Sequence, residues 1–157
     1  MNEATIVANP GEQSIHITRV FDAPPEKVFK AMTTKELVQK WWTGPGYDVT
    51  IEQFDPRDGG SWKFLHTKGK ESYTFHGSYH EVSPTRIVQT FEFGGLPERG
   101  HVAIEKMELA ELPDGKTKMT VNSTYMTVAD RDGMIQSGME EGTQATYRSL
   151  DKVLEEM

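Results

Sequence analysis

The sequence contains no cysteine, and this absence excludes disulfides, thiolate zinc sites and cysteine nucleophiles together. Positive charge is scarce, since 17 Lys and Arg stand against 24 Asp and Glu and leave a formal charge of −7. Because an acidic surface repels phosphate backbones, we expect no nucleic-acid partner. Long apolar runs are also missing, and none approaches the roughly 18 residues that a membrane-spanning helix needs. We therefore expect no membrane insertion.

The 157 residues are enough for one domain and too few for two. The opening MNEATIVANP carries an acid where an export signal would have basic residues, so we expect no secretory signal. Residues 1–12 are expected to be a flexible leader, and residues 13–157 a single domain. A cytoplasmic protein is predicted, either a monomer or a weak homodimer, that needs no staple to fold.

Hydrophobic patterning divides the domain into strands and helices. SIHITRVF, from Ser14, alternates as a strand does, and two short helices with apolar stripes are expected between residues 22 and 42. Turn residues then separate six further strands. These are expected at 47–54, 61–66, 72–82, 86–93, 101–112 and 116–126. Residues 132–157 return to a spacing of three and four, which predicts one long C-terminal helix.

Short turns favour hairpins, so the strands are expected to form an antiparallel meander. The predicted fold class is α+β, with a seven-stranded curved antiparallel sheet that covers the long C-terminal helix.

Trp41 and Trp42 stand side by side at the end of the second short helix. Adjacent helical residues point about 100° apart, so the two indoles cannot face the same way. We expect one of them to anchor the helix to the sheet. The other, for which we select Trp42, would lie at a cavity mouth beside a gate formed by the helix and residues 44–46. The alternative is that both indoles form a plain hydrophobic plug.

Aromatic residues recur on one parity of three expected strands. The sets are Trp62, Phe64 and His66; Tyr73, Phe75, Gly77 and Tyr79; and Ile87, Gln89, Phe91 and Phe93. Facing the helix, they would line a pocket for a small molecule, or else simply fill the core. Gly138 and Gly142 lie four apart in the expected long helix, where each costs about 1 kcal/mol relative to Ala. Either a strand packs closely against these glycines or a cavity opens there.

Catalytic and metal signals are weak. His66 shares its parity with Trp62 and Phe64 and is the best candidate for a buried titratable group, with Tyr73 or Tyr79 as a proton-carrying partner. His76 and His80 would lie about 13 Å apart on a strand, too far to share one ion, so we expect no metal and no cofactor. Several glutamates lie on expected strands without a recognisable acid–base spacing. They are Glu52, Glu81, Glu92, Glu105 and Glu108.

Four segments in this order resemble the family named after the activator of heat-shock protein 90 ATPase, within the START-like or helix-grip superfamily. They are ITRVFDAPPEKVFKAMTTKELVQKWWTGPG, DPRDGGSWKF, GSYHEVSPTRIVQTFEF and SGMEEGTQATYRSLDKVL. The resemblance runs from about Ser14 to Glu156. It implies a curved sheet that grips the C-terminal helix around a cavity for apolar ligands such as lipids, sterols or polyketides.

The same resemblance bears on Thr143. Members of this branch often carry Trp after the second glycine of the C-terminal helix, where this chain has Thr143. The smaller side chain leaves room where an indole would stand. The eukaryotic co-chaperones of the family carry a further domain for their partner, which this sequence shows no sign of.

Three functions follow as expectations. The leading one is binding of a small apolar or aromatic molecule in the cavity. The alternatives are a cyclase, dehydratase or hydrolase that uses the same cavity, and an interaction module whose partner is a chaperone of the stress response. The expected ligand-binding residues are Trp41, Trp42, Trp62, Phe64, His66, Tyr73, Phe75, Phe91, Met119, Gly138, Met139, Gly142 and Thr143.

Overall fold

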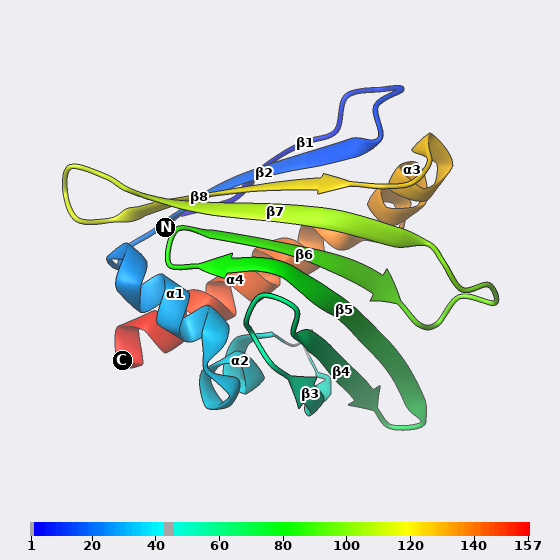
Figure 1. Cartoon of the computed structure of the whole chain (residues 1–157), viewed down its shortest axis with the longest axis horizontal. Helices are drawn as coiled ribbons and strands as arrows, with labels where there is room; N and C mark the ends of the chain where they lie inside the picture. Colours follow the sequence, from blue (N-terminus) through cyan, green and yellow to red (C-terminus); the bar gives the residue numbers. More distant parts are fainter. Residues whose placement is uncertain (1, 43–45) are drawn as a thin grey trace.

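A curved antiparallel sheet of eight strands wraps around the C-terminal helix in the computed structural model, which describes residues 2–42 and 46–157 (Figure 1). The strands are β1 (Thr5–Val7), β2 (Ser14–Phe21), β3 (Asp48–Phe54), β4 (Ser61–Lys68), β5 (Glu71–Ser83), β6 (Arg86–Phe93), β7 (Val102–Glu111) and β8 (Thr117–Thr124). Their order across the sheet is β1-β2-β8-β7-β6-β5-β4-β3. The predicted α+β helix-grip fold is confirmed.

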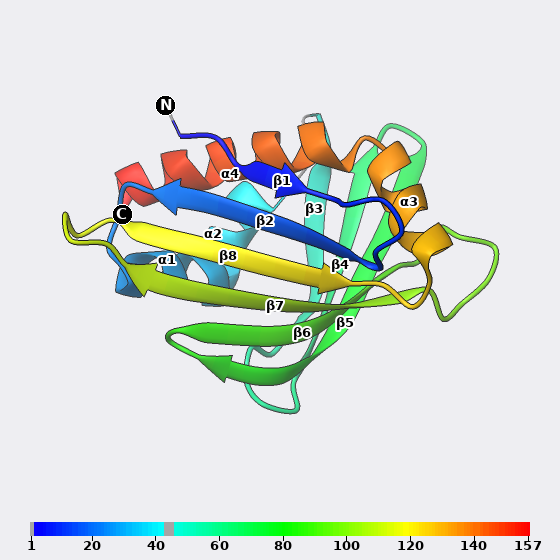
Figure 2. The ribbon, with the colours of Figure 1, turned by 90° about the horizontal axis from the view of Figure 1, so that it is seen from above.

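The sheet has one strand more than the seven expected, because residues 5–7 of the expected leader form β1. β1 lies beside β2 and runs antiparallel to it (Figure 2), and the register places Ile6 opposite Ile17. The side-chain amide of Gln144 holds the start of this segment by two hydrogen bonds to the backbone of Ala4, of 2.8 and 2.9 Å. A strand of three residues is too short to show a period of two, so only its partner reveals it.

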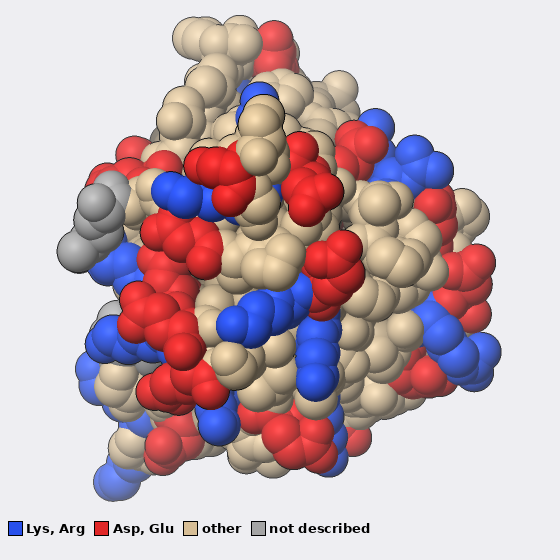
Figure 3. Space-filling view, turned by 90° about the vertical axis from the view of Figure 1, so that its left-hand side faces the viewer, with Lys and Arg blue, Asp and Glu red and all other residues tan. Residues whose placement is uncertain are grey.

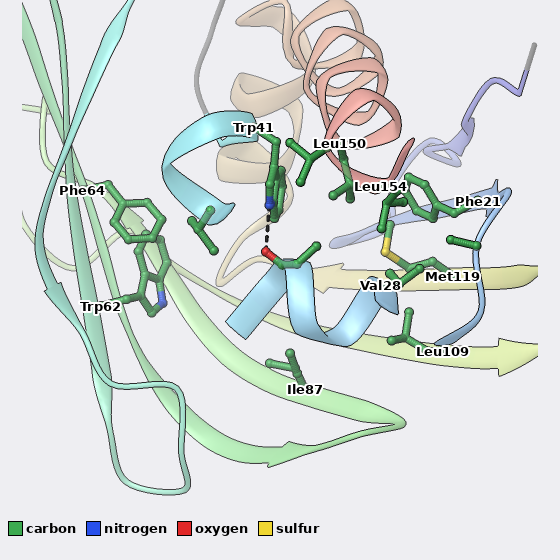
Figure 4. Packing of buried hydrophobic residues seen from close by; sticks show 14 of the residues in the cluster. Phe21, Val28, Trp41, Trp62, Phe64, Ile87, Leu109, Met119, Leu150 and Leu154 are labelled. Atoms are coloured by element: carbon green, nitrogen blue, oxygen red, sulfur yellow. Dashed lines mark hydrogen bonds between the residues drawn. The ribbon is translucent and has the colours of Figure 1, made fainter. Parts of the chain in front are cut away.

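Two short helices, α1 (Pro25–Thr33) and α2 (Lys35–Trp41), connect β2 to β3. α1 begins at a proline, which the first turn tolerates because its missing N–H has no intrahelical acceptor there. Trp41 is buried, and its indole N–H donates a 2.9 Å hydrogen bond to the carbonyl oxygen of Ala31 (Figure 4). This indole therefore fixes α2 against α1.

The single long helix expected over residues 132–157 is instead two helices, α3 (Val128–Gln136) and α4 (Met139–Glu156). Gly138 separates them with a φ of +85°, a left-handed conformation that ends a helix and that glycine adopts without steric cost. The expectation that Gly138 is an interior helix residue was wrong. The hydrophobic spacing of three and four continues through the break, which is why the sequence pattern conceals it.

α4 is joined to the concave face of the sheet by apolar packing and one ion pair. Leu150 and Leu154 are buried in the main core (Figure 4), and so is Val153. Arg19 of β2 is only 1% exposed, and its guanidinium contacts both carboxylate oxygens of Asp151 at 2.6 and 2.7 Å. This bidentate geometry fixes both distance and orientation between helix and sheet.

The surface around the C-terminus carries intermixed acidic and basic side chains (Figure 3). Across residues 2–42 and 46–157, no helix combines the length with the apolar character that crossing a bilayer demands.

Glu92 connects the loop after β6 to the outer face of the sheet. Its carboxylate accepts hydrogen bonds from the Arg99 guanidinium at 3.0 and 3.2 Å and from the Gly100 N–H at 2.9 Å. The imidazole of His76 on β5 lies 3.3 Å away. Chiefly because of Arg99, and next because of the Gly100 N–H, the pKa of Glu92 falls to about 2.

We expect Glu92→Gln to lower the free energy of unfolding by about 1–2 kcal/mol at neutral pH. Arg99 is 76% exposed, and solvent screening keeps this value below the full linkage energy. The folded pKa lies below the unfolded one, so the contribution is complete above about pH 4.5 and is lost as the pH falls toward 2. Urea unfolding of both proteins at about pH 7 and pH 3 measures it, and an equal stability gap at the two pH values would contradict it.

Candidate ligand cavity

A cavity of about 1180 Å³ lies between the concave face of the sheet and helices α3 and α4. It is large enough for a drug-sized molecule. Every residue expected to bind a ligand lines it except Gly138, which lies in the α3–α4 break. Tyr79, named as a weak catalytic candidate, also lines it. The period of two thus correctly placed the inward-facing side chains of β4, β5 and β6.

Trp42 lies among the aromatic side chains at one end of the cavity. Its ring centroid is 4.8 Å from that of Phe64, 5.4 Å from Phe75 and 5.8 Å from Trp62, all close to edge-on. Edge-to-face contacts of this kind are favourable beyond simple area burial. Trp42 is therefore the indole that packs on the sheet, where it forms an aromatic wall with Trp62, Phe64 and Phe75. Its neighbour Trp41 is hydrogen-bonded to α1, so the expected anchor to the sheet is wrong in its partner. Of the proposed gate, residues 44 and 45 lie outside the described residues.

His66 belongs to the same wall. It is half-buried, its ring centroid lies 5.0 Å from that of Trp42, and its Nε2 is 3.2 Å from the Trp42 carbonyl oxygen. Burial lowers the pKa of His66. The neutral imidazole with its proton on Nε2 can donate to this carbonyl, so the side chain acts here as a clamp on the end of α2.

The catalytic candidates do not all converge. Tyr73 is the cross-strand neighbour of His66. Tyr79 is far from it: β4 and β5 pair Trp62 with Gly77, so Tyr79 lies six strand positions from His66, about 20 Å along the sheet. A proton relay between His66 and Tyr79 is therefore not built into this cavity.

A polar row crosses the middle of the apolar concave face. Gln89, Glu105 and Ser123 are direct cross-strand neighbours on β6, β7 and β8. The Gln89 amide donates to one carboxylate oxygen of Glu105 at 3.1 Å, and the Ser123 hydroxyl donates to the other at 3.2 Å. The flanking rows are apolar, with Phe91 and Ala103 on one side and Ile87, Met107 and Val121 on the other.

Burial raises the pKa of Glu105, and the two hydrogen bonds only partly oppose this. Two tyrosines that line the cavity, Tyr125 and Tyr147, also have raised pKa values, first because of burial and second because of the negative charge of Glu105. Their hydroxyl groups therefore remain protonated and able to donate. This part of the cavity combines a carboxyl group with phenols in an otherwise apolar setting.

Glu105 is the feature that sequence reasoning missed, because it was judged only by its spacing to other acids. The available signal was parity: Glu105 alternates with Ala103, Met107 and Leu109, all of which face the cavity or the core. When a glutamate stands among apolar residues on one face of a predicted strand, either the predicted face is wrong or the carboxyl group points inward for a functional reason.

The exposed part of the lining comes from two segments. Leu96, Pro97 and Glu98 belong to the β6–β7 loop, and Gly133, Ser137 and Gly142 to the α3–α4 unit. His101 connects them, with its Nδ1 at 3.0 Å from both carboxylate oxygens of Asp130 on α3. A Cβ added at Gly142 would meet no atom within 4 Å. Of the two explanations for Gly142, close strand packing therefore fails and open space remains.

Within residues 2–42 and 46–157, His, Asp and Glu form no cluster of three that could hold a metal ion. His76, considered for a metal pair, contacts Glu92 instead.

Comparison with known proteins places this architecture in context. Residues 22–155 match the family model described as activator of Hsp90 ATPase homolog 1-like protein. A crystal structure from Rhodobacter sphaeroides is 23% identical, with a TM-score of 0.88 over 99% of both chains. A solution structure from Staphylococcus epidermidis is 28% identical, with a TM-score of 0.84 over 97% of this chain and 94% of that one. No curated protein matches the chain. The solved structures establish a shared fold.

Proposed function

Because the chain belongs to the activator of Hsp90 ATPase homolog 1-like family, whose fold is consistent with a ligand-binding cavity, we propose that it binds a small apolar or aromatic molecule between its sheet and α4. The family assignment confirms the resemblance inferred from the sequence. What carries the proposal is the cavity of about 1180 Å³, with an aromatic wall at one end.

The wall supports a ligand with a flat apolar body. Trp42, Trp62 and Phe75 present ring faces and edges at the same end of the cavity. Burying 200 Å² of apolar ligand surface would contribute about 5 kcal/mol before the costs of association are subtracted. A dissociation constant on the order of micromolar is a reasonable scale for such a complex.

We expect Thr143→Trp to weaken binding of a neutral biphenyl-ethanol probe at least about tenfold. Thr143 lines the cavity from α4, and an indole at this position would occupy space that the ligand needs. Threonine and tryptophan have similar helix propensities, so the helix itself should be little affected. Isothermal titration calorimetry measures the affinity. Its signal, unlike tryptophan fluorescence, is not altered by the added indole.

Lys152→Trp is the matched control. Lys152 lies on the same helix, is exposed and does not line the cavity, so its replacement should leave affinity unchanged within about twofold. Equal binding by the wild type and Thr143→Trp would count against the cavity as the binding site. Failure of the wild type to bind this probe or other apolar and aromatic compounds would count against the function.

The two alternatives have less support. An acid–base enzyme built on His66 would have Tyr73 as its cross-strand neighbour, but Tyr79 lies at a separate place along the sheet. The imidazole Nε2 is also within hydrogen-bond distance of the Trp42 carbonyl oxygen. A chaperone partner is suggested by the family's description alone. The binding proposal has both the family's fold and the geometry of the cavity behind it.

A further inference from the structure

The charged groups that line the cavity are all acids or histidines. The acids are Glu98, Glu105 and Asp130, and the described lining residues include no lysine or arginine. The two buried arginines, Arg19 and Arg131, do not line the cavity and already have the carboxylate partners Asp151 and Asp132. A cavity for fatty acids or phosphorylated ligands would need a cation to offset their charge.

In two of the three acids, the carboxylate charge is already stabilised by a partner side chain or by solvent. Asp130 pairs with His101, and Glu98 is a rim residue with a side chain that is 86% exposed. Glu105 differs, because both of its hydrogen-bond partners within the described chain, Gln89 and Ser123, are neutral. A carboxylate offers about four acceptor positions, so two remain for a ligand.

The neighbours of Glu105 suit an ionic partner. Both of its partners donate to it, which favours the carboxylate form, whereas burial favours the neutral form and raises its pKa. A ligand cation would supply the missing counter-charge and so offset the cost of burying the carboxylate. The phenols of Tyr125 and Tyr147 lie in the same electrostatic environment, and aromatic rings also attract cations.

We propose that the cavity selects a ligand with an aromatic body and a cationic amine, with the ammonium group bound by Glu105 and the body packed against the aromatic wall. This inference rests on the proposed binding function and adds the chemical class of the ligand. Phe91, which contacts Trp62 at a centroid distance of 6.0 Å, lies two residues from Gln89 on β6. Gln89 is the cross-strand neighbour of Glu105, so Phe91, at the edge of the wall, is offset from Glu105 by about 7 Å along the strands and about 5 Å across one strand spacing. A short alkyl linker between the aromatic body and the amine suits this offset.

Three probes that share one biphenyl body test the charge preference: a para-ethylamine, a para-ethanol and a para-acetic acid. At neutral pH we expect the wild type to bind the amine at least about tenfold more tightly than the acid, with the alcohol between them. In Glu105→Gln, which preserves shape and removes the charge, the amine and acid should differ by less than about threefold. The affinity of the alcohol should change by less than about threefold.

Glu108→Gln is the control, because it removes an exposed carboxylate that lies on the same strand as Glu105 but outside the cavity lining, and it should leave the amine preference within about twofold of wild type. The wild type alone can overturn the inference. If it binds the alcohol, and binds the acid as tightly as the amine, the inference is refuted. A tenfold preference that survives in folded Glu105→Gln would also refute it. If the alcohol, the amine and the acid all fail to bind, the proposed function fails instead.

Discussion

Replacing Asp151 with alanine is expected to lower the free energy of unfolding by about 3 kcal/mol. The change leaves the Arg19 guanidinium charged and only 1% exposed, without the carboxylate that contacts it at 2.6 and 2.7 Å. Removing one partner of a buried pair costs more than the pair contributes, because the remaining charge cannot regain water. The estimate is at the lower end of the usual range because Asp151 is 27% exposed. Urea unfolding followed by circular dichroism measures the effect.

Two further variants separate the pair from a general effect on α4. Glu155→Ala removes an exposed acid from the same helix and should change stability by less than about 0.5 kcal/mol. The double variant Arg19→Met with Asp151→Ala replaces the pair by apolar groups and should recover most of the loss. The explanation is wrong if Asp151→Ala unfolds like Glu155→Ala, or if the double variant is no more stable than Asp151→Ala. Because this pair holds α4 over the sheet, its loss would also deform the cavity.

Gly77→Ala is expected to destabilise the protein by about 3 kcal/mol or more. A Cβ at this position would lie 1.9 Å from the carbonyl oxygen of Thr90 and 2.6 Å from the indole nitrogen of Trp62. The first obstacle is backbone of the neighbouring strand β6, which cannot rotate away as a side chain would. Strand pairing between β5 and β6 must therefore open, and Trp62 must move out of the aromatic wall. Chemical denaturation and the near-ultraviolet circular dichroism of the tryptophans report both effects.

Gly142→Ala is the matched control: it is the same substitution, but it is expected to raise the free energy of unfolding instead of lowering it. Gly142 lies within α4, and an added Cβ would meet no atom within 4 Å. Alanine should therefore stabilise the helix by about 0.5–1 kcal/mol through its higher helix propensity. If Gly77→Ala and Gly142→Ala changed stability equally, close strand approach would not be the reason for Gly77.

The positions of the residues in the aromatic wall could be predicted from local sequence patterns. Trp62, Phe64 and Phe75 lie inward because side chains alternate strictly along a strand, and this period can be read from the sequence. That Trp41 and Trp42 face different ways was also foreseeable, because adjacent helical residues diverge by about 100°. Which indole joins which neighbours was not foreseeable, because the contacts of Trp42 come from β4 and β5.

The hydrogen-bond partners of Glu105 could not be predicted from local sequence patterns. Its partners are 16 and 18 residues away in the chain, and only the register of β6, β7 and β8 brings them into one row. A shift of one residue in either pairing would turn the carboxylate to the opposite face from its partners. The break at Gly138 is similar: glycine permits both signs of φ, so packing of α3 and α4 decides between them.

The sequence by itself determined the fold class, most of the element boundaries and the faces of the strands, because these follow from residue types and from periods of two and about 3.6. Tertiary structure alone decided that three residues of the leader pair with β2, that the last helix divides in two, and that the Glu105 carboxyl group faces the cavity between two neutral donors. Each of these depends on contacts between distant parts of the chain, whose energies no local pattern records.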